Sequence, residues 1–144
     1  MSTQETLNPV APTDDGLVWT IRYSWGLEPG PLDTVAVGTG TGDRDLSRST
    51  LRNEVHREPL SGGSFDIVPD SADPTILYGI VELGGGLELA AGTEVTEVGL
   101  ITTATGPETL AWLYKPPAPI PFPSGERNEI VMPMPIARQS GGGG

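Results

Sequence analysis

Few residues in this chain are of types that carry out chemistry, and most of those are carboxylates. There is no cysteine and His56 is the only histidine, which leaves little material for nucleophilic triads, thiolate chemistry or zinc sites. Glu94 and Glu97 could form a glycosidase pair, but residues three apart on a strand point to opposite faces. The sequence predicts no catalytic residue, and we expect a protein that is not an enzyme.

Aspartates in the expected loops offer oxygen ligands to a hard cation such as calcium, which binds six to eight oxygens. No EF-hand spacing is present, and loop aspartates more often cap helices and form turns. We therefore expect no metal or cofactor, with calcium binding as the open alternative. The candidate ligands are Asp43, Asp45, Asp66, Asp70 and Asp73.

Glycines alternate with threonines from Gly38 to Gly42, as they could in a loop that binds phosphate. The spacing lacks the G-x-G-x-x-G pattern, and no Gly-Lys-Ser/Thr follows. The pattern instead favours a strand that ends in a tight turn and leads into a helix beginning at Asp43 or Asp45.

Two regions are predicted to contact a partner. Trp19 and Trp112 are in phase with apolar neighbours and are predicted to be core, whereas Trp25 precedes a loop of prolines and glycines. A proline block at residues 116–123 carries Ile120 and Phe122, and a preformed extended segment loses little entropy on docking. We expect the partner contacts at Trp25, Ile120 and Phe122.

The charge excludes some partners. There are 19 acidic and 8 basic residues, for a net charge of −11, which disfavours binding to nucleic acid. No apolar run approaches a membrane span and residues 1–8 lack a secretory signal, so we expect a soluble protein with no membrane partner. Seven of the eight basic residues are arginine, which indicates either adaptation to concentrated salt or a GC-rich codon bias.

Hydrophobic alternation predicts a chain of short strands. Residues 17–24 alternate most clearly, with Leu17, Trp19, Ile21 and Tyr23 on one side. A final strand at 129–136 must be an edge strand because its two prolines lack amide donors. Further strands are expected at 32–37, 65–68, 75–83, 87–91, 93–102 and 110–114.

One helix is predicted at residues 43–57, where glycine and proline are absent, and Pro59 ends it. On this helix Asn53 and Arg57 would form a surface ladder, and His56 would cap a carbonyl near its end.

These elements predict an all-β fold, an antiparallel β-sandwich of seven to eight short strands with one short α-helix. The sandwich is expected at residues 17–137, with an extended arm at 1–16 and a flexible glycine-rich tail at 138–144.

Four segments, in order, resemble the sandwich domain of phage tail-fibre and tail-collar proteins. They are Val-Ala-Val-Gly-Thr-Gly-Thr-Gly at 35–42, Leu-Arg-Asn-Glu-Val-His-Arg at 51–57, Thr-Glu-Val-Thr-Glu-Val-Gly-Leu-Ile at 93–101 and Tyr-Lys-Pro-Pro at 114–117. The similarity covers residues 33–136, and we expect no long shaft or receptor-binding tip after Ile136.

The resemblance implies a non-enzymatic structural component of a tailed-virus virion, in the tail, the baseplate or a tail-fibre adaptor. We expect assembly in the host cytoplasm into a homo-oligomer, a trimer or ring, with other virion tail or baseplate proteins as partners. Salt adaptation would point to a virus of a halophilic host. The alternative is a stand-alone carbohydrate- or receptor-binding β-sandwich module.

Overall fold

The computed structural model describes residues 10–27, 31–60, 65–73, 76–83, 93–104, 108–122 and 128–137. Within them the chain forms ten strands and one helix. In order they are β1 (Ala11–Pro12), α2 (Asp14–Ser24), β2 (Thr34–Gly38), β3 (Glu54–Pro59), β4 (Phe65–Pro69), β5 (Ile76–Leu83), β6 (Thr93–Val95), β7 (Glu97–Thr102), β8 (Thr109–Tyr114), β9 (Ile120–Phe122) and β10 (Asn128–Ala137).

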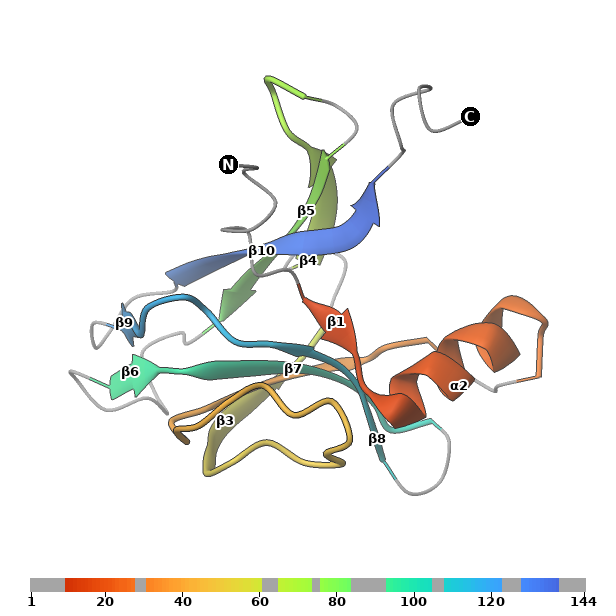
Figure 1. The fold of residues 1–144 in the computed structure, drawn as a ribbon, viewed down its shortest axis with the longest axis horizontal. Coiled ribbons are helices and arrows are strands. Elements are labelled where there is room, and N and C mark those ends of the chain that lie inside the picture. The colour runs from red at the N-terminus through yellow and green to blue at the C-terminus, as the bar shows by residue number, and fades with distance from the viewer. Residues whose placement is uncertain are drawn as a thin grey trace.

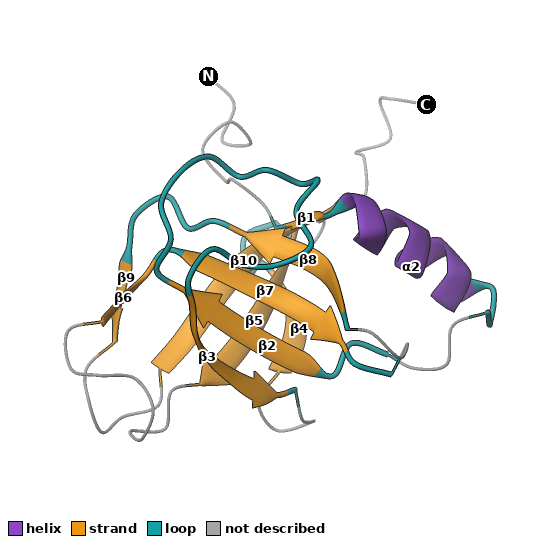
Figure 2. Cartoon of the chain, turned by 90° about the horizontal axis from the view of Figure 1, so that it is seen from below, coloured by secondary structure: helices purple, strands orange, loops and turns teal. Residues whose placement is uncertain are grey.

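The strands form two layers, and every pairing is antiparallel. A five-stranded sheet of order β1-β8-β7-β2-β3 faces a three-stranded sheet of order β10-β5-β4, while β6 and β9 pair at one end of the molecule (Figures 1 and 2). This confirms the expected antiparallel β-sandwich. There are more strands than predicted because the segment at 93–102 divides into β6 and β7, and β1, β3 and β9 were not predicted.

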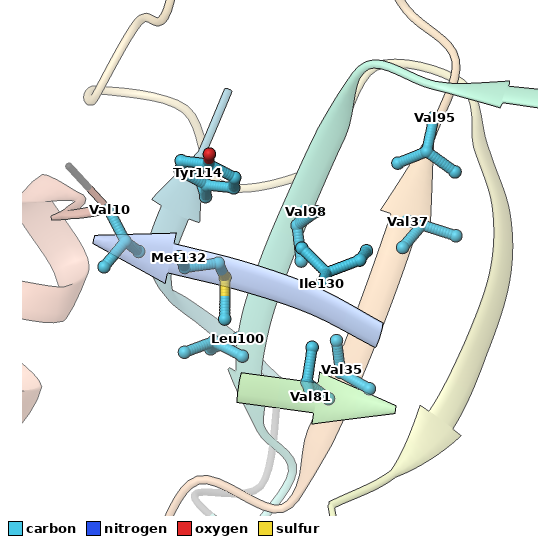
Figure 3. Packing of buried hydrophobic residues seen from close by; sticks show 10 residues of the cluster. All are labelled: Val10, Val35, Val37, Val81, Val95, Val98, Leu100, Tyr114, Ile130 and Met132. Carbon is cyan, nitrogen blue, oxygen red and sulfur yellow. The ribbon is translucent and has the colours of Figure 1, made fainter. Parts of the chain in front are cut away.

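The main core lies between the two layers. Side chains from both sheets point toward one another there (Figure 3), among them Val98 and Leu100 of β7 and Ile130 and Met132 of β10. Alternate residues of β2 and β7 face the other side of the five-stranded sheet, where Leu51 from the loop at residues 39–53 packs against Ala36 and Ile101. Both central strands are therefore covered on two faces, and every residue of β7 is buried.

The predicted strand at 17–24 is wrong, because these residues lie in helix α2. The side chain of Thr13 accepts a hydrogen bond from the amide of Gly16 at 2.9 Å, and Asp14 and Asp15 occupy the first turn, where carboxylates favour a helix. Leu17, Trp19, Ile21 and Tyr23 do not share one face, since residues two apart lie about 200° apart around a helix.

The predicted helix at 43–57 is also wrong. Residues 39–53 form a loop over the outer face of the five-stranded sheet, and β3 follows. Asn53 has a φ of 50°, a left-handed conformation that ends the loop. Pro59 ends the edge strand β3, where a missing amide is tolerated.

The expected arm at 1–16 extends too far. Val10 is fully buried and its amide donates to the carbonyl of Pro133 at 2.8 Å, β1 pairs with β8, and Thr13 caps α2. Residues 10–16 therefore belong to the folded domain. Residues 1–9 and the expected tail at 138–144 lie outside the described residues.

The remaining strand predictions agree with the structure to within two residues at each end. β2, β4, β5, β8 and β10 correspond to the segments expected at 32–37, 65–68, 75–83, 110–114 and 129–136, and β10 is an edge strand as its prolines required. The expected strand at 87–91 lies outside the described residues. The proline block contains β9, which pairs with β6.

Candidate interaction surface

Trp25, one of the three predicted contact residues, lies at the C-terminal end of α2. Its amide donates to the carbonyls of Ile21 and Arg22, which closes the last turn of the helix, and its side chain is 77% exposed. Gly26 follows with a φ of 76° and ends the helix in the usual way. The ring is thus held at a fixed point on the surface.

Trp25 is not isolated, because a row of exposed apolar side chains runs along the same side of α2. Leu17, Val18 and Ile21 are each more than half exposed, and at helical spacing they lie with Trp25 within about 100° of arc. We call these four residues the outer stripe. Sequence analysis missed it, because alternation placed Leu17 and Ile21 on the buried side of a strand.

The opposite side of α2 packs on the sandwich. The backbone at Gly16 lies so close to β8 that a Cβ atom there would overlap the carbonyl of Ala111. Trp19 is buried as predicted, although on a helix, and its ring stacks on Tyr23 with 5.1 Å between centroids. From this anchor α2 extends away from both sheets (Figures 1 and 2).

The other predicted contact residues lie elsewhere. Ile120 is half-buried on β9 and packs against the main core, so its side chain serves the fold. Phe122 pairs with Thr93 through its backbone, and its side chain lies outside what the structure describes. The pair β6 and β9 lies at the end of the molecule opposite α2 (Figures 1 and 2), so the structure does not bring the three predicted residues together.

Glu97 is the most constrained carboxylate in the described part of the chain. It is fully buried on β7 and takes a two-pronged ion pair from Arg48, with Nη1 2.6 Å from Oε2 and Nη2 2.9 Å from Oε1. The amide of Arg52 also donates to Oε1 at 2.8 Å. Burial raises the pKa of Glu97, but these hydrogen bonds outweigh burial and the pKa falls below its ordinary value.

This ion pair locks the loop at 39–53 onto the sheet. Glu94 is exposed on β6, and both oxygens of Glu97 are engaged, so the two do not form a glycosidase pair. Arg48 is 49 positions from Glu97, and no local pattern indicated the contact.

The glycines at 38–42 allow the same loop to approach. A Cβ atom on Gly40 would overlap the side chain of Arg52, and the hydroxyl of Thr96 donates to the carbonyl of Gly40 at 2.5 Å. Strand β2 ends at Gly38, but the predicted tight turn and helix do not follow, because the amides of Thr39 and Gly40 donate to the carbonyls of Asn53 and Arg52 and the chain then enters the loop. The lack of a side chain at these glycines lets this segment pack closely against residues 52–53.

The other polar side chains singled out in the sequence have local partners. Asp45 accepts hydrogen bonds from the amide and hydroxyl of Ser47, and Asp70 accepts from the amides of Ala72 and Asp73, which are turn-forming roles. Among the described residues, no group of three or more acidic or histidine side chains could hold a metal ion.

The expected roles of His56, Asn53 and Arg57 on a helix are wrong because two of them lie on strand β3 and the third in the preceding turn. His56 Nε2 is 2.7 Å from Glu58 Oε2, and Arg57 contacts Glu54 and Glu108. Asn53 donates to the hydroxyl of Thr39 at 2.5 Å across the turn.

Comparison with protein-family models, curated proteins and solved structures found no match to this chain. In the described segments, no helix is long and apolar enough to cross a membrane.

Proposed function

We propose that this chain is a non-enzymatic structural component of a tailed-virus virion, in the tail, the baseplate or a tail-fibre adaptor, and that it assembles into a symmetric homo-oligomer. Its partners would be copies of itself and neighbouring tail or baseplate proteins.

The observation that carries the proposal is that three of the four segments resembling tail-fibre and tail-collar proteins meet in one place. The segments at 35–42 and 93–101 contribute the neighbouring strands β2 and β7, and the segment at 51–57 begins in the loop that covers them. Arg52 from the segment at 51–57 contacts both Glu97 and Gly40, which come from the other two segments. Segments that pack against one another in this way support the proposal that the resemblance to tail-fibre and tail-collar proteins extends to the fold.

The roles of the polar side chains also favour a structural protein. Asp33, like Glu97, has its carboxylate occupied by the fold, since it accepts from the amide and hydroxyl of Thr103 and from the hydroxyl of Thr34. Burial raises the pKa of Asp33, but these hydrogen bonds prevail and lower it. A carboxylate stabilised in its charged form and engaged on both oxygens is a poor general acid.

The alternative is a stand-alone module that binds carbohydrate or a receptor. The exposed ring of Trp25 favours this alternative, because an aromatic side chain can stack on the face of a sugar. The two proposals differ in the state of the protein in solution.

The mass of the full chain in solution separates them. A structural oligomer should have, by light scattering in about 2 M salt, a mass at least twice the 15.1 kDa of one chain, even where about 0.1 M salt dissociates it. A monomer in both buffers that binds glycans on an array would contradict the proposal and favour the binding module.

A further inference from the structure

Helix α2 is apolar on two opposite sides, and the sandwich covers only one of them. The inner side, with Gly16 and Trp19, is buried against β8. The outer stripe is exposed, from 52% at Leu17 to 77% at Trp25. Polar residues separate the two apolar sides, and Asp14 lies at the N-terminal end of the outer stripe. A contiguous exposed apolar surface of this kind is typical of an interaction site, so the outer stripe predicts a further contact.

The exposed apolar area is large enough for a symmetric dimer. Together with Leu27, which is 58% exposed just beyond the helix, the outer stripe presents about 500 Å² to solvent. Two copies facing each other, with their flanking polar residues, would bury roughly 1,200 Å², the lower limit for specific interfaces.

The charges beside the outer stripe indicate how two copies would be oriented. Asp15 and Arg22 are both exposed and lie on the same flank of the stripe, because seven residues are close to two helical turns. When two such helices pack antiparallel about a two-fold axis, these flanks adjoin in reversed order. Arg22 of each copy then lies beside Asp15 of the other, whereas parallel packing does not pair them.

We propose that α2 packs antiparallel against α2 of a second copy of this chain, through the outer stripe, about a two-fold axis near Val18. The inference deepens the proposed function, because it rests on the homo-oligomer proposed above and specifies one of its contacts. It specifies a two-fold contact between copies, where the sequence led us to expect a trimer or ring.

The absence of cysteine from the sequence allows a direct test by disulfide trapping in the full chain. In the antiparallel pair the two copies of Val18 are near the axis, so Val18→Cys should form a covalent dimer with itself on mild oxidation. Two copies of residue 15, or of residue 22, would be about 10 Å apart along the helix, beyond the roughly 7 Å Cα separation that a disulfide spans.

The distinguishing experiment is a mixture of Asp15→Cys and Arg22→Cys. Neither variant should cross-link alone, and the mixture should yield the mixed dimer at least about tenfold faster than either variant alone yields its own. Efficient cross-linking of each variant with itself would contradict the antiparallel arrangement, because it indicates parallel or three-fold packing of α2.

A second variant tests the contact without cysteine. Ile21→Asp should weaken self-association by about 30-fold or more, as loss of a central apolar anchor does, when measured by sedimentation of the full chain. Ile67→Asp on β4 is the matched control, since Ile67 is 47% exposed and lies on the other sheet. Circular dichroism confirms that both variants remain folded.

The outcomes separate this inference from the proposed function. A dimer that is lost in Ile21→Asp and retained in Ile67→Asp supports both. A homo-oligomer that Ile21→Asp leaves intact overturns the helix contact alone. A monomer at all concentrations and salt levels overturns both the contact and the proposed homo-oligomer.

Discussion

At the scale of single residues, the fold depends on one buried charge. Glu97 on β7 fastens the loop at 39–53 to the sheet, and Arg48, only 11% exposed, neutralises it. Removing one member of such a pair leaves the other charged and poorly solvated, which is why breaking buried pairs is costly. The exposed pair of Arg57 and Glu108 has the same chemistry in a setting where it contributes little.

We expect Glu97→Gln to lower the free energy of unfolding by about 3 kcal/mol, because it leaves the guanidinium of Arg48 without its counter-charge. Glu108→Gln is the matched control and should cost less than about 1 kcal/mol. Urea denaturation of the three proteins measures both values. Equal losses of unfolding free energy in the two variants would show that the buried ion pair contributes no more to stability than the exposed pair.

The same pair predicts a pH dependence. The pKa of Glu97 is lower in the folded state than its ordinary value of 4.5, so its stabilisation is complete above about that pH and is lost as the pH falls through the folded pKa. The difference in unfolding free energy between the unaltered protein and Glu97→Gln should therefore shrink as the pH is lowered from about 6 to about 3. A difference that stays constant over this range would mean that Glu97 is not charged in the folded protein.

Val98→Asp should abolish folding. Val98 is 1% exposed on β7, and an unpaired carboxylate there costs several kcal/mol, comparable to the stability of a whole domain. Val131→Asp, at a position 46% exposed on β10, is the control and should remain folded. A soluble, folded Val98→Asp protein by circular dichroism would show that this strand is not in the core.

At the scale of elements, the sequence predicts what depends on local pattern and misses what depends on distant contacts. β5 and β8 follow from short apolar and aromatic runs, and the prolines of β10 correctly place it at an edge. Alternation failed at 17–24 because α2 exposes apolar side chains, so Leu17 and Ile21 are spaced like the buried face of a strand. The capping residues Thr13, Asp14 and Asp15 were the signal that favoured a helix.

The loop at 39–53 could not be predicted from neighbouring residues. Its position is fixed by contacts with residues distant in sequence, since Glu97 of β7 binds Arg52 and Leu51 packs in a cluster with Ala36 and Ile101. The exposure of the outer stripe was also not predicted. The predicted strand at 17–24 placed Leu17 and Ile21, two of the four residues of the stripe, on its buried side.

The close approach of α2 to β8 predicts an unusual response to alanine. Gly16→Ala would ordinarily stabilise a helix, but here the added methyl group meets the carbonyl of Ala111, and we expect a loss of about 1–3 kcal/mol. Ser24→Ala, at the exposed end of the same helix, is the control and should change stability by less than about 1 kcal/mol. Thermal unfolding measures both, and a more stable Gly16→Ala protein would place α2 away from the sheet.

At the scale of the whole molecule, a net charge of −11 opposes any contact between copies. The outer stripe of α2 would supply the apolar contact proposed above, and the salt concentration would decide whether that contact outweighs the repulsion. The screening length falls from about 30 Å at 0.01 M salt to about 3 Å at 1 M, so concentrated salt removes most of the opposition.

If the acidic composition reflects work in concentrated salt, melting temperature and oligomer fraction should rise together between about 0.1 and about 2 M salt. Sulfate should act more strongly than chloride if apolar burial contributes, since it strengthens burial as well as screening. Calorimetry and light scattering on the same samples measure the two quantities. Equal melting temperatures and equal particle sizes across the range would contradict salt adaptation and leave codon bias as the reason for the arginines.

The central claim is that this chain is built into a virus particle, and a cryo-electron-microscopy map of particles from a host that carries its gene tests that claim most directly. We expect repeated density for the two-sheet sandwich in the tail or baseplate, with copies related by symmetry. A complete map of the tail and baseplate in which every density is assigned to other chains would contradict it.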